Sequence, residues 1–362
     1  MNDELYPIRD KLLSGEHISE AEGEALYAST DLLALGRLAE IVSARATGAE
    51  RTLVKARRIR YSNVCRNQCR YCLNAKPPGA PGAYTRSVPE VVDLVGEAVA
   101  AGIHQFQLTG GTNPDVTYDY YLDMLSAIRD AYPDVHLQGF APAQLAAITV
   151  MVQSRFAAVL CDLRDAGLNS ILEDGADIFD PRIRKVLCGA KATGGQWLQV
   201  MRDAHSVGLA GGASMLYGHY EGAEEKLHHL SYLRDLQDET GGFTFYAPRA
   251  YTPTEYSMDP GTLVGGTEDL REFAVARVFL AGVPHVRCYA NDLGMKTTQI
   301  ALHFGVDTVV CRVHDDEPVH DADRADRRLP NALQLRELIE RSGFDVRTAA
   351  LDQRPADYLL AE

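Results

Sequence analysis

The sequence predicts an α/β protein built on a (β/α)8 barrel of the TIM type, with a helical segment before the barrel and a cap after it. Eight short β-prone runs follow one another from residue 59 onward, and helix-patterned segments separate them. A chain of 362 residues also has the length that a single barrel needs. An open sheet or a partial barrel of six units would give nearly the same pattern, but eight units favour closure.

Residues 1–54 are expected to form short amphipathic helices. Ser19, Glu20 and Glu22 have the pattern of a capped helix start, and apolar residues between 32 and 41 recur at helical spacing. The segment lacks the basic and then apolar run of a signal peptide. We therefore expect a cytoplasmic protein.

The barrel is expected to occupy residues 55–315, and the cap residues 316–362. The cap would consist of the charged run HDADRADRR, one helix over 331–342 and a loose tail. Within the barrel, helical patterns are plainest at 89–101, 118–131, 223–239 and 267–281. The β-prone runs cover 59–64, 104–109, 135–140, 168–172, 210–216, 242–247, 285–290 and 306–311.

Composition excludes several classes of function. Asp and Glu number 50 against 36 Lys and Arg, so a net charge of -14 would repel a nucleic-acid backbone. No apolar stretch approaches the roughly twenty residues that cross a bilayer, so we expect no membrane partner. With 46% apolar residues the chain can build a core without disulfides. These observations leave a small-molecule substrate as the expected partner.

Three of the seven cysteines lie within eight residues, in NVCRNQCRYC. Cys65, Cys69 and Cys72 follow the first β-prone run, which would place them in a loop at the mouth of the barrel. Structural zinc sites and electron-transfer clusters take four protein ligands, so three thiolates leave one position open for chemistry. The alternative is a structural zinc ion completed by a distant thiol such as Cys311, although paired Cys-x-x-Cys knuckles are absent from the sequence.

In a barrel of this kind chemistry lies where the strands end, and this rule gives further candidates. Gly110 and Gly111, after the second run, would let backbone groups approach a ligand closely, although a glycine pair is often only a tight turn. The polar side chains after the later runs are Gln144, Glu173, Asp177, Tyr217, His219, Arg249, Tyr251, Asn291, Asp292 and Arg312.

The spacing of the three cysteines, with Tyr71 before the last, resembles that of the radical S-adenosylmethionine (SAM) enzymes. The resemblance implies that Cys65, Cys69 and Cys72 hold a 4Fe–4S cluster, and that its reduction cleaves SAM to a 5'-deoxyadenosyl radical. It also implies an electron donor of the flavodoxin or ferredoxin type. TGGTNP, at 109–114, is similar to the glycine segment that receives the SAM amino group. The cofactor-binding residues implied in this way are Tyr71, Gly110, Gly111, Thr112, Gln144, Glu173 and Asp177.

The resemblance extends over about residues 5–345 through segments such as AGLNSILEDGADIFDPRIRKVLC and GMKTTQIALHFGVDTV. These look like the group that contains aminofutalosine synthase, dehypoxanthine futalosine cyclase and the FO synthase subunits, and MLYGH at 215–219 is most similar to the first. In aminofutalosine synthase the radical adds to the enol-ether double bond of an enolpyruvyl-oxybenzoate. The resemblance therefore implies a C–C bond-forming transferase of menaquinone biosynthesis. The alternative is hydrogen abstraction with release of 5'-deoxyadenosine, as in the cyclase or FO synthase.

Several positions depart from that pattern. Asn113 stands where the family has His, Leu73-Asn74 replaces Ala-Phe after the cysteines, and Asp177 replaces the common Glu. Arg249 stands where the family tends to be apolar, and could clamp a substrate carboxylate or pair with Glu255 or Asp259. These changes predict an altered acceptor, used in a specialised nucleoside or natural-product pathway.

The remaining expectations concern side chains at the barrel mouth. His219 could hold a substrate carboxylate or act as a general acid or base, or it could be a histidine satisfied by the backbone. His228 and His229 fall on a charged helical segment and are expected to face solvent. The expected catalytic residues are His219, Tyr217 and Arg249, and the expected substrate contacts are Asn74, Asn113, Tyr251, Asn291, Asp292 and Arg312.

Overall fold

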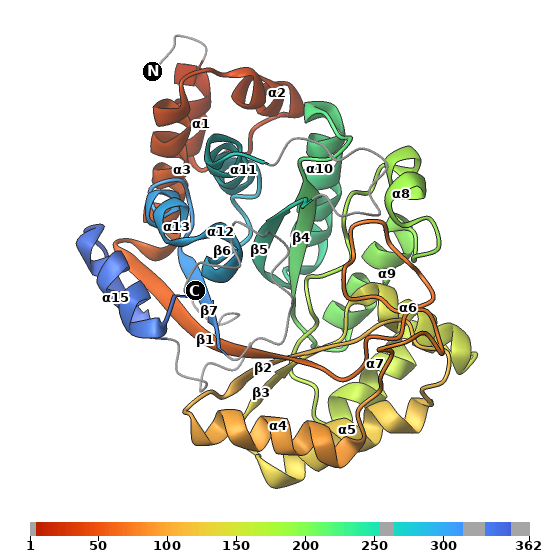
Figure 1. Cartoon of the computed structure of the whole chain (residues 1–362). Coiled ribbons are helices and arrows are strands. Elements are labelled where there is room, and N and C mark those ends of the chain that lie inside the picture. Colours follow the sequence, from red (N-terminus) through yellow and green to blue (C-terminus); the bar gives the residue numbers. More distant parts are fainter. Residues whose placement is uncertain (1–4, 253–263, 314–329, 349–362) are drawn as a thin grey trace.

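The computed structural model describes residues 5–252, 264–313 and 330–348. The chain begins with three helices, α1 (Tyr6–Ser14), α2 (Glu20–Ala28) and α3 (Leu32–Thr47). The expected capped start is confirmed, because Ser19 and Glu22 form a reciprocal capping box at the start of α2. On the outside of the barrel, α2 packs against α10 (Ala223–Thr240) and α11 (Gly266–Phe279), α3 packs against α11, and α1 packs against α3 (Figure 1).

A ring of parallel strands forms the centre of the molecule. The sheet runs in the order β3-β2-β1-β7-β6-β5-β4. Isolated bridges from Gln138 to Ser170 and from Ile171 to Gly211 join β3 to β4 and close the ring. The closed barrel is thus confirmed. The strands are β1 (Glu50–Arg60), β2 (Gln105–Thr109), β3 (His136–Gln138), β4 (Gly211–Tyr217), β5 (Phe243–Ala250), β6 (His285–Tyr289), β7 (Thr308–Arg312) and β8 (Asp345–Thr348).

Three features of the ring differ from the expectation. The run 168–172 contributes only the two bridges instead of a full strand. The first strand begins at Glu50 instead of 59, so the expected barrel start at residue 55 lies inside it. Five basic residues within 51–60 conceal this strand in the sequence, although it is largely buried. β8 was not predicted. It pairs with residues 50–53 of β1, whereas β2 pairs with residues 56–60 of the same strand. The charged run of the expected cap lies outside the described residues.

The helices cover the outside of the ring (Figure 1). Side chains at Ser87, Thr117, Asp180 and Thr193 accept hydrogen bonds from the first turns of four of them and so fix where they begin. Among the described residues no single helix is long and apolar enough to cross a membrane, although α6 and α7, bent by 105°, pass that test as a pair. The helices are α4 (Val88–Ala100), α5 (Tyr118–Ala131), α6 (Pro142–Met151), α7 (Phe156–Asp165), α8 (Pro181–Cys188), α9 (Gly194–Ser206), α10 (Ala223–Thr240), α11 (Gly266–Phe279), α12 (Ala290–Leu293), α13 (Met295–Ala301) and α15 (Ala332–Arg341).

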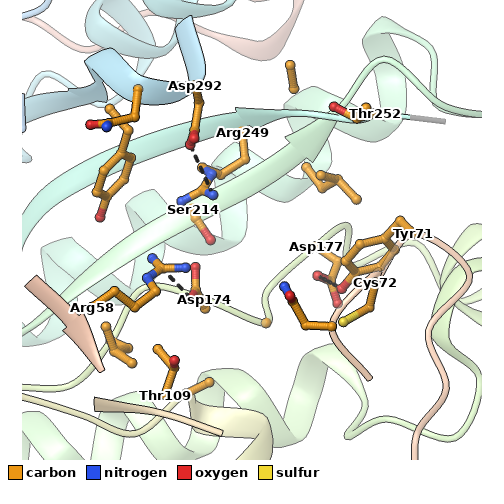
Figure 2. A pocket seen from close by; sticks show the side chains of 18 of the residues that line it. Arg58, Tyr71, Cys72, Thr109, Asp174, Asp177, Ser214, Arg249, Thr252 and Asp292 are labelled. Atoms are coloured by element: carbon orange, nitrogen blue, oxygen red, sulfur yellow. Dashed lines mark hydrogen bonds and ion pairs between the residues drawn. The ribbon is translucent and has the colours of Figure 1, made fainter. Parts of the chain in front are cut away.

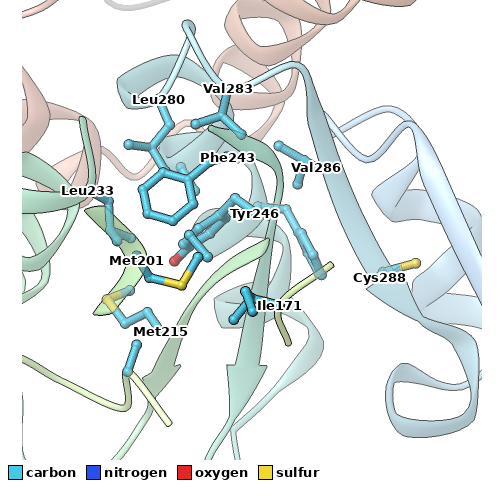
Figure 3. Close-up of a cluster of buried hydrophobic side chains, with 14 of the residues drawn as sticks. Ile171, Met201, Met215, Leu233, Phe243, Tyr246, Leu280, Val283, Val286 and Cys288 are labelled. Atoms are coloured by element: carbon cyan, nitrogen blue, oxygen red, sulfur yellow. The ribbon is translucent and has the colours of Figure 1, made fainter. Parts of the chain in front are cut away.

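Apolar side chains fill the space between strands and helices. Figure 3 shows one part of this core, where Met201, Met215, Leu233, Phe243 and Leu280 pack together. Burial of this kind stabilises the fold by about 25 cal/mol per Å² of apolar surface. The outer face of the barrel is therefore sealed, and any chemistry must take place inside the ring.

The inside of the ring changes from apolar to polar along the strands. Successive side chains of a strand point to opposite faces, so alternate residues share the interior. A small buried cluster of Val54, Ala56, Phe245, Ala247, Tyr289 and Val310 fills the lower interior. Two residues further along the same strands, and so on the same interior face, lie three arginines that line the cavity. They are Arg58 after Ala56, Arg249 after Ala247 and Arg312 after Val310. The barrel thus has a solid base and a cationic floor beneath its mouth.

Candidate active site

One cavity of about 840 Å³ opens at the carboxyl ends of the strands. This is where the barrel rule places the chemistry. The structure brings most of the sequence-predicted residues to its walls (Figure 2). Those that line it are Cys65, Cys69, Tyr71, Cys72, Asn74, Gly110, Gly111, Thr112, Gln144, Asp177, Tyr217, Arg249, Asn291, Asp292 and Arg312.

The cysteine loop, residues 61–87, is held by its own backbone. The Cys65 N–H donates to the Lys76 carbonyl at 2.9 Å, and the Cys72 N–H donates to the Cys69 carbonyl at 3.0 Å. The Ser62 hydroxyl donates to the Tyr84 carbonyl at 2.9 Å and joins the two arms of the loop. These bonds fix the turn that presents all three thiols to one wall of the cavity.

The glycine pair allows this loop to lie against the loop after β2. A Cβ on Gly111 would stand 2.0 Å from the Val64 carbonyl oxygen, and one on Gly110 would stand 2.3 Å from the Tyr61 ring. The close approach lets the Thr112 N–H donate to the Cys65 sulfur at 3.3 Å. An N–H···S bond of this kind stabilises a thiolate. In this structure the glycines serve the packing of the two loops.

A buried ionic group anchors the aromatic residue of the cysteine motif. The Tyr71 hydroxyl donates to Asp177 Oδ1 at 2.5 Å, and Lys191 Nζ lies 2.9 Å from both that hydroxyl and Asp177 Oδ2. Arg184 Nη1 lies 3.5 Å from the same carboxylate. Burial acts to raise the pKa of Asp177, but the charges of Lys191 and Arg184 hold it well below its usual range. Asp177 is therefore ionised, with both oxygens bonded within the chain.

The surroundings of the thiols differ: burial raises the pKa of Cys72, whereas the pKa of Cys69 is lowered. A hydrogen bond with the Cys188 thiol lowers the pKa of Cys69 to about 7, helped by the Lys191 charge and opposed by burial. No three His, Cys, Asp or Glu side chains of the described chain converge closely enough to hold a single metal ion. In a cluster each thiolate binds a separate iron, so no such convergence is needed. Cys311 lies buried on β7 with its thiol against the Pro330 carbonyl, outside the cavity lining, and does not complete a zinc site with the triad.

The opposite part of the cavity is cationic. Arg58 Nη2 lies 3.6 Å from Asp174 Oδ2, and Arg249 Nη2 lies 3.1 Å from Asp292 Oδ2. Arg312 also pairs with Asp292. Figure 2 shows the first two pairs facing each other, away from Tyr71 and Cys72. Among the residues that the structure describes, Asp174 and Asp292 thus lie beside these three guanidinium groups. Burial opposes the charge of Arg249, yet Asp292 and Asp174 raise its pKa above the usual range.

Tyr289 forms the floor between these arginines. The guanidinium carbons of Arg249 and Arg312 lie 4.8 Å and 5.1 Å from its ring centroid. Its hydroxyl donates to Glu173 Oε1 and accepts a 3.1 Å hydrogen bond from Gln107 Nε2. Burial, followed by the Glu173 charge, raises the pKa of Tyr289 well above its usual range. The phenol is therefore a fixed, neutral part of the floor.

Four predicted residues lie outside the cavity lining, each for a physical reason. Glu173 is fully buried, and its carboxylate accepts a hydrogen bond from the Tyr289 hydroxyl. Asn113 donates to the Ser62 and Thr85 hydroxyls at 3.1 Å and 2.9 Å, and so ties two loops together. His219 Nδ1 lies 2.7 Å from Glu221 Oε2, and His219 Nε2 lies 2.9 Å from the Leu216 carbonyl oxygen. Both ring nitrogens thus have partners within the chain, as in the alternative of a satisfied histidine. The Tyr251 ring packs edge-on against His219.

Several lining residues already have partners within the chain. The Tyr217 hydroxyl donates to Asp269 at 2.6 Å. Gln144 donates to the Tyr61 hydroxyl at 2.8 Å and to the Gly111 carbonyl at 3.3 Å. Asn291 exchanges two hydrogen bonds with the backbone of Arg312. Glu255 and Asp259, the expected alternative partners of Arg249, lie outside the described residues. These contacts fix the walls of the cavity.

Sequence reasoning missed Arg58, Asp174, Cys188 and Lys191. Arg58 could have been found from its register, because it follows Val54 and Ala56 at steps of two on one strand. Cys188 stands apart from the cysteine motif in the sequence, yet its thiol lies 3.4 Å from Asp177 Oδ2. Lys191 lies in a surface-like segment, KATGG, and no pattern marks it.

Comparison with known proteins gives consistent matches. The profile of the Radical SAM superfamily matches residues 59–233. The chain is 35% identical to the aminodeoxyfutalosine synthase of Thermus thermophilus over 92% of this chain and 90% of that one. It is 33% identical to the enzyme of the same name from Streptomyces coelicolor, over 93% and 90%, and 30% identical to the cyclic dehypoxanthine futalosine synthase of that organism, over 94% and 86%.

Solved structures share the fold. Methylornithine synthase superposes with a TM-score of 0.76 at 18% identity, covering 97% of this chain and 99% of that chain. A maturase of the [FeFe]-hydrogenase, HydG, also gives a TM-score of 0.76, at 16% identity, covering 96% and 76%.

Proposed function

Because the chain belongs to the radical SAM superfamily, we propose that it adds the 5'-deoxyadenosyl group of SAM to an olefinic acceptor of the enolpyruvyl type, forming a C–C bond. The protein is a radical SAM enzyme: it uses a 4Fe–4S cluster and SAM, acts on a small molecule and needs a reductant. Its curated relatives include two aminodeoxyfutalosine synthases, which supports adenosylation over hydrogen abstraction.

The observation that carries the proposal is a single cavity with two chemically different ends. Three cysteines stand on one wall, and Arg58, Arg249 and Arg312 stand at the other end. A volume of about 840 Å³ is at the upper end of the usual range for ligand pockets, which suits two ligands held side by side. One end would take SAM and the other an anionic acceptor.

At the first end, Cys65, Cys69 and Cys72 would hold the cluster. When bound, the cluster supplies the electron that cleaves SAM. The chain itself contributes a rigid loop, because Tyr71 is fastened to Asp177 and the Thr112 N–H is aimed at the Cys65 sulfur. Positioning of this kind lets reacting atoms meet without further rearrangement.

At the second end, Arg249 and Arg312 would bind a carboxylate of the acceptor. Both guanidinium groups lie over the Tyr289 ring and share the single carboxylate of Asp292, which is itself partly exposed. An acceptor carboxylate would bind between these two guanidinium groups, beside Asp292. Planar guanidinium groups bind carboxylates through two parallel hydrogen bonds, which fixes the orientation of the olefin. Arg58, with Asp174, would serve a second polar group of the acceptor.

Part of the cavity wall is apolar. Leu172, Leu216, Pro248, Phe273 and Leu293 line it, and none of them has a polar side-chain atom. A dry wall protects a carbon radical from side reactions with solvent. This matches the demand of a radical addition, in which the adenosyl carbon must meet only the olefin.

The test is anaerobic reconstitution with iron and sulfide, followed by dithionite, SAM labelled in its adenosine, and enolpyruvyl-oxybenzoate. We expect the label in a covalent adduct that mass spectrometry detects. Release of all the label as 5'-deoxyadenosine would instead support hydrogen abstraction. Replacement of Cys65, Cys69 or Cys72 by Ala should abolish SAM cleavage, whereas Cys311→Ala should not, because Cys311 lies outside the cavity lining. Cleavage that survives in any of the first three variants would contradict the cluster assignment.

A further inference from the structure

We propose that the surface around the cysteine loop is the docking site for a small acidic electron-transfer protein of the flavodoxin or ferredoxin type. The inference rests on the function proposed above, since that reaction consumes an electron at this loop. It adds the location of the partner and the chemistry that recognises it. We define the docking surface as Arg66, Lys185, Val150, Met151 and Val186.

The cysteine loop and its flanking helices differ in charge from the rest of the chain. The whole chain carries a net charge of -14. Residues 61–89, 141–155 and 181–191, which are the cysteine loop and the two helices that flank it with their following turns, contain nine Lys and Arg and no Asp or Glu. Arg184 and Lys191 are buried beside Asp177, and Arg182 pairs with Asp180 and Glu225. The other six cations are exposed or half-buried. An acidic protein would be repelled by most of this molecule and attracted to this part. The charge pattern therefore directs such a partner to the loop that binds the cluster.

The docking surface lies next to the cysteine loop. The Arg66 N–H donates to the Thr112 carbonyl at 3.1 Å, which places the start of the loop beside the groove that borders α6. The Arg70 N–H donates to the Leu187 carbonyl at 2.9 Å, which places the loop beside α8. The three cysteines thus lie on a loop held between these two helices (Figure 1).

The docking surface combines cations with exposed apolar side chains. Arg66 and Lys185 are exposed and pair with none of the carboxylates in the described ranges. Val150, Met151 and Val186 keep 73%, 42% and 39% of their surface exposed. Arg66, Val150 and Met151 also border a groove of about 260 Å³ beside the main cavity. Exposed apolar groups among cations suit a transient partner, because the cations guide the encounter and the apolar groups hold the contact.

The electron balance of the step is simple. One electron passes from the reduced flavin or iron–sulfur centre of the partner to the cluster on the cysteine thiolates. The partner is oxidised by one electron and then dissociates, so a short-lived complex with weak, salt-sensitive affinity is required. An exposed basic surface provides that affinity without burying charge permanently.

The test compares three charge reversals, Arg66→Glu, Lys185→Glu and the control Arg37→Glu. Arg37 is an exposed arginine on α3, far from the cysteine loop (Figure 1). The affinity for a flavodoxin of strongly negative net charge is measured by calorimetry at low salt, with the flavodoxin oxidised so that no turnover occurs. We expect Arg66→Glu and Lys185→Glu each to weaken binding roughly three- to tenfold, with the difference from Arg37→Glu vanishing as salt rises.

A second measurement separates docking from damage to the site. The rate of cluster reduction by dithionite, and the adduct formed with dithionite, should be the same in Lys185→Glu, in Arg37→Glu and in the parent. The reduction rate with reduced flavodoxin should fall only in Arg66→Glu and Lys185→Glu. Equal binding by these variants and Arg37→Glu would overturn the proposal. So would displacement of the flavodoxin by an oligonucleotide of equal charge, because it would show a general polyanion surface. Failure to form the adduct with dithionite would instead count against the proposed function.

Discussion

The Tyr71 hydroxyl donates a 2.5 Å hydrogen bond to Asp177, although the two residues are 106 positions apart in the chain. One lies between two cysteines of the motif, and the other lies in the turn before α8. Lys191 bridges them through its ammonium group. This contact couples the position of the cysteine loop to a buried ion pair elsewhere in the barrel.

Replacement of Lys191 by Met should destabilise the protein by about 3 kcal/mol, because it leaves Asp177 buried with only the more distant Arg184 as a counter-charge. Iron content after reconstitution should fall as well, since Tyr71 loses one of its two partners. Thermal unfolding and iron analysis check this. Lys185→Met is the control, being an exposed lysine of the same region. Equal stability of the two variants would contradict the role of Lys191.

Stability should fall as the pH is lowered from 6.5 towards 3, in part because of His229. This histidine is fully buried and stacked on Phe179, contrary to the expectation that it faces solvent. Burial lowers its pKa from 6.5 to about 3, so the folded state resists a proton that the unfolded chain accepts in this window. The loss from this one group has an upper limit on the order of 5 kcal/mol.

His229→Gln should make the fall in melting temperature with acidification shallower, since Gln can still donate to the Ser214 carbonyl that His229 contacts. Its neighbour His228 is exposed, and His228→Gln should leave the slope unchanged. The slope will not vanish in the first variant, because burial also lowers the pKa of His136 and His205 to about 4. A slope that is the same in both variants would show that His229 is not the group responsible.

Arg249→Gln should raise the KM for the acceptor by roughly 10- to 100-fold, as expected for the loss of one charge-assisted contact. The KM for SAM should stay unchanged, because the arginine stands at the other end of the cavity from the cysteines. Steady-state kinetics with each substrate varied in turn checks both. Lys296→Gln is the control for general attraction, since Lys296 is an exposed cation that lines the same cavity. A similar KM in the two variants would remove the specific role of Arg249.

Gly111→Ala should prevent cluster assembly. The new Cβ would stand 2.0 Å from the Val64 carbonyl oxygen, which cannot move without displacing Cys65. Overpacking of this kind costs about 1–3 kcal/mol, and here the strain falls on the cysteine loop. Absorbance of the reconstituted protein near the iron–sulfur charge-transfer bands reports assembly. Gly195→Ala, at the start of α9, is the control because its Cβ would meet no atom within 4 Å. Normal absorbance in Gly111→Ala would refute the packing argument.

The sequence was sufficient for features that depend on local patterns. The closed barrel follows from repeated β-α units, and the cysteine loop follows from a motif of eight residues. β8 escaped prediction because a strand of four residues, largely exposed, has almost no apolar alternation. The roles of His219 and Asn113 could not be settled because each is satisfied by partners that only the folded backbone brings near. Lys191 escaped for the same reason, since its partner Asp177 is supplied by another turn.

The pairing of β1 has a consequence for folding during synthesis. β1 emerges from the ribosome early, yet it pairs with β7 along one edge and with β8 along the first half of the other. These partners lie about 250 to 300 residues later in the chain. At synthesis rates of roughly 5–20 residues per second, the first half of β1 therefore stays unpaired for many seconds after it is made. Its run of basic side chains then acts as a gatekeeper, since charged strands resist pairing with the edges of other nascent chains.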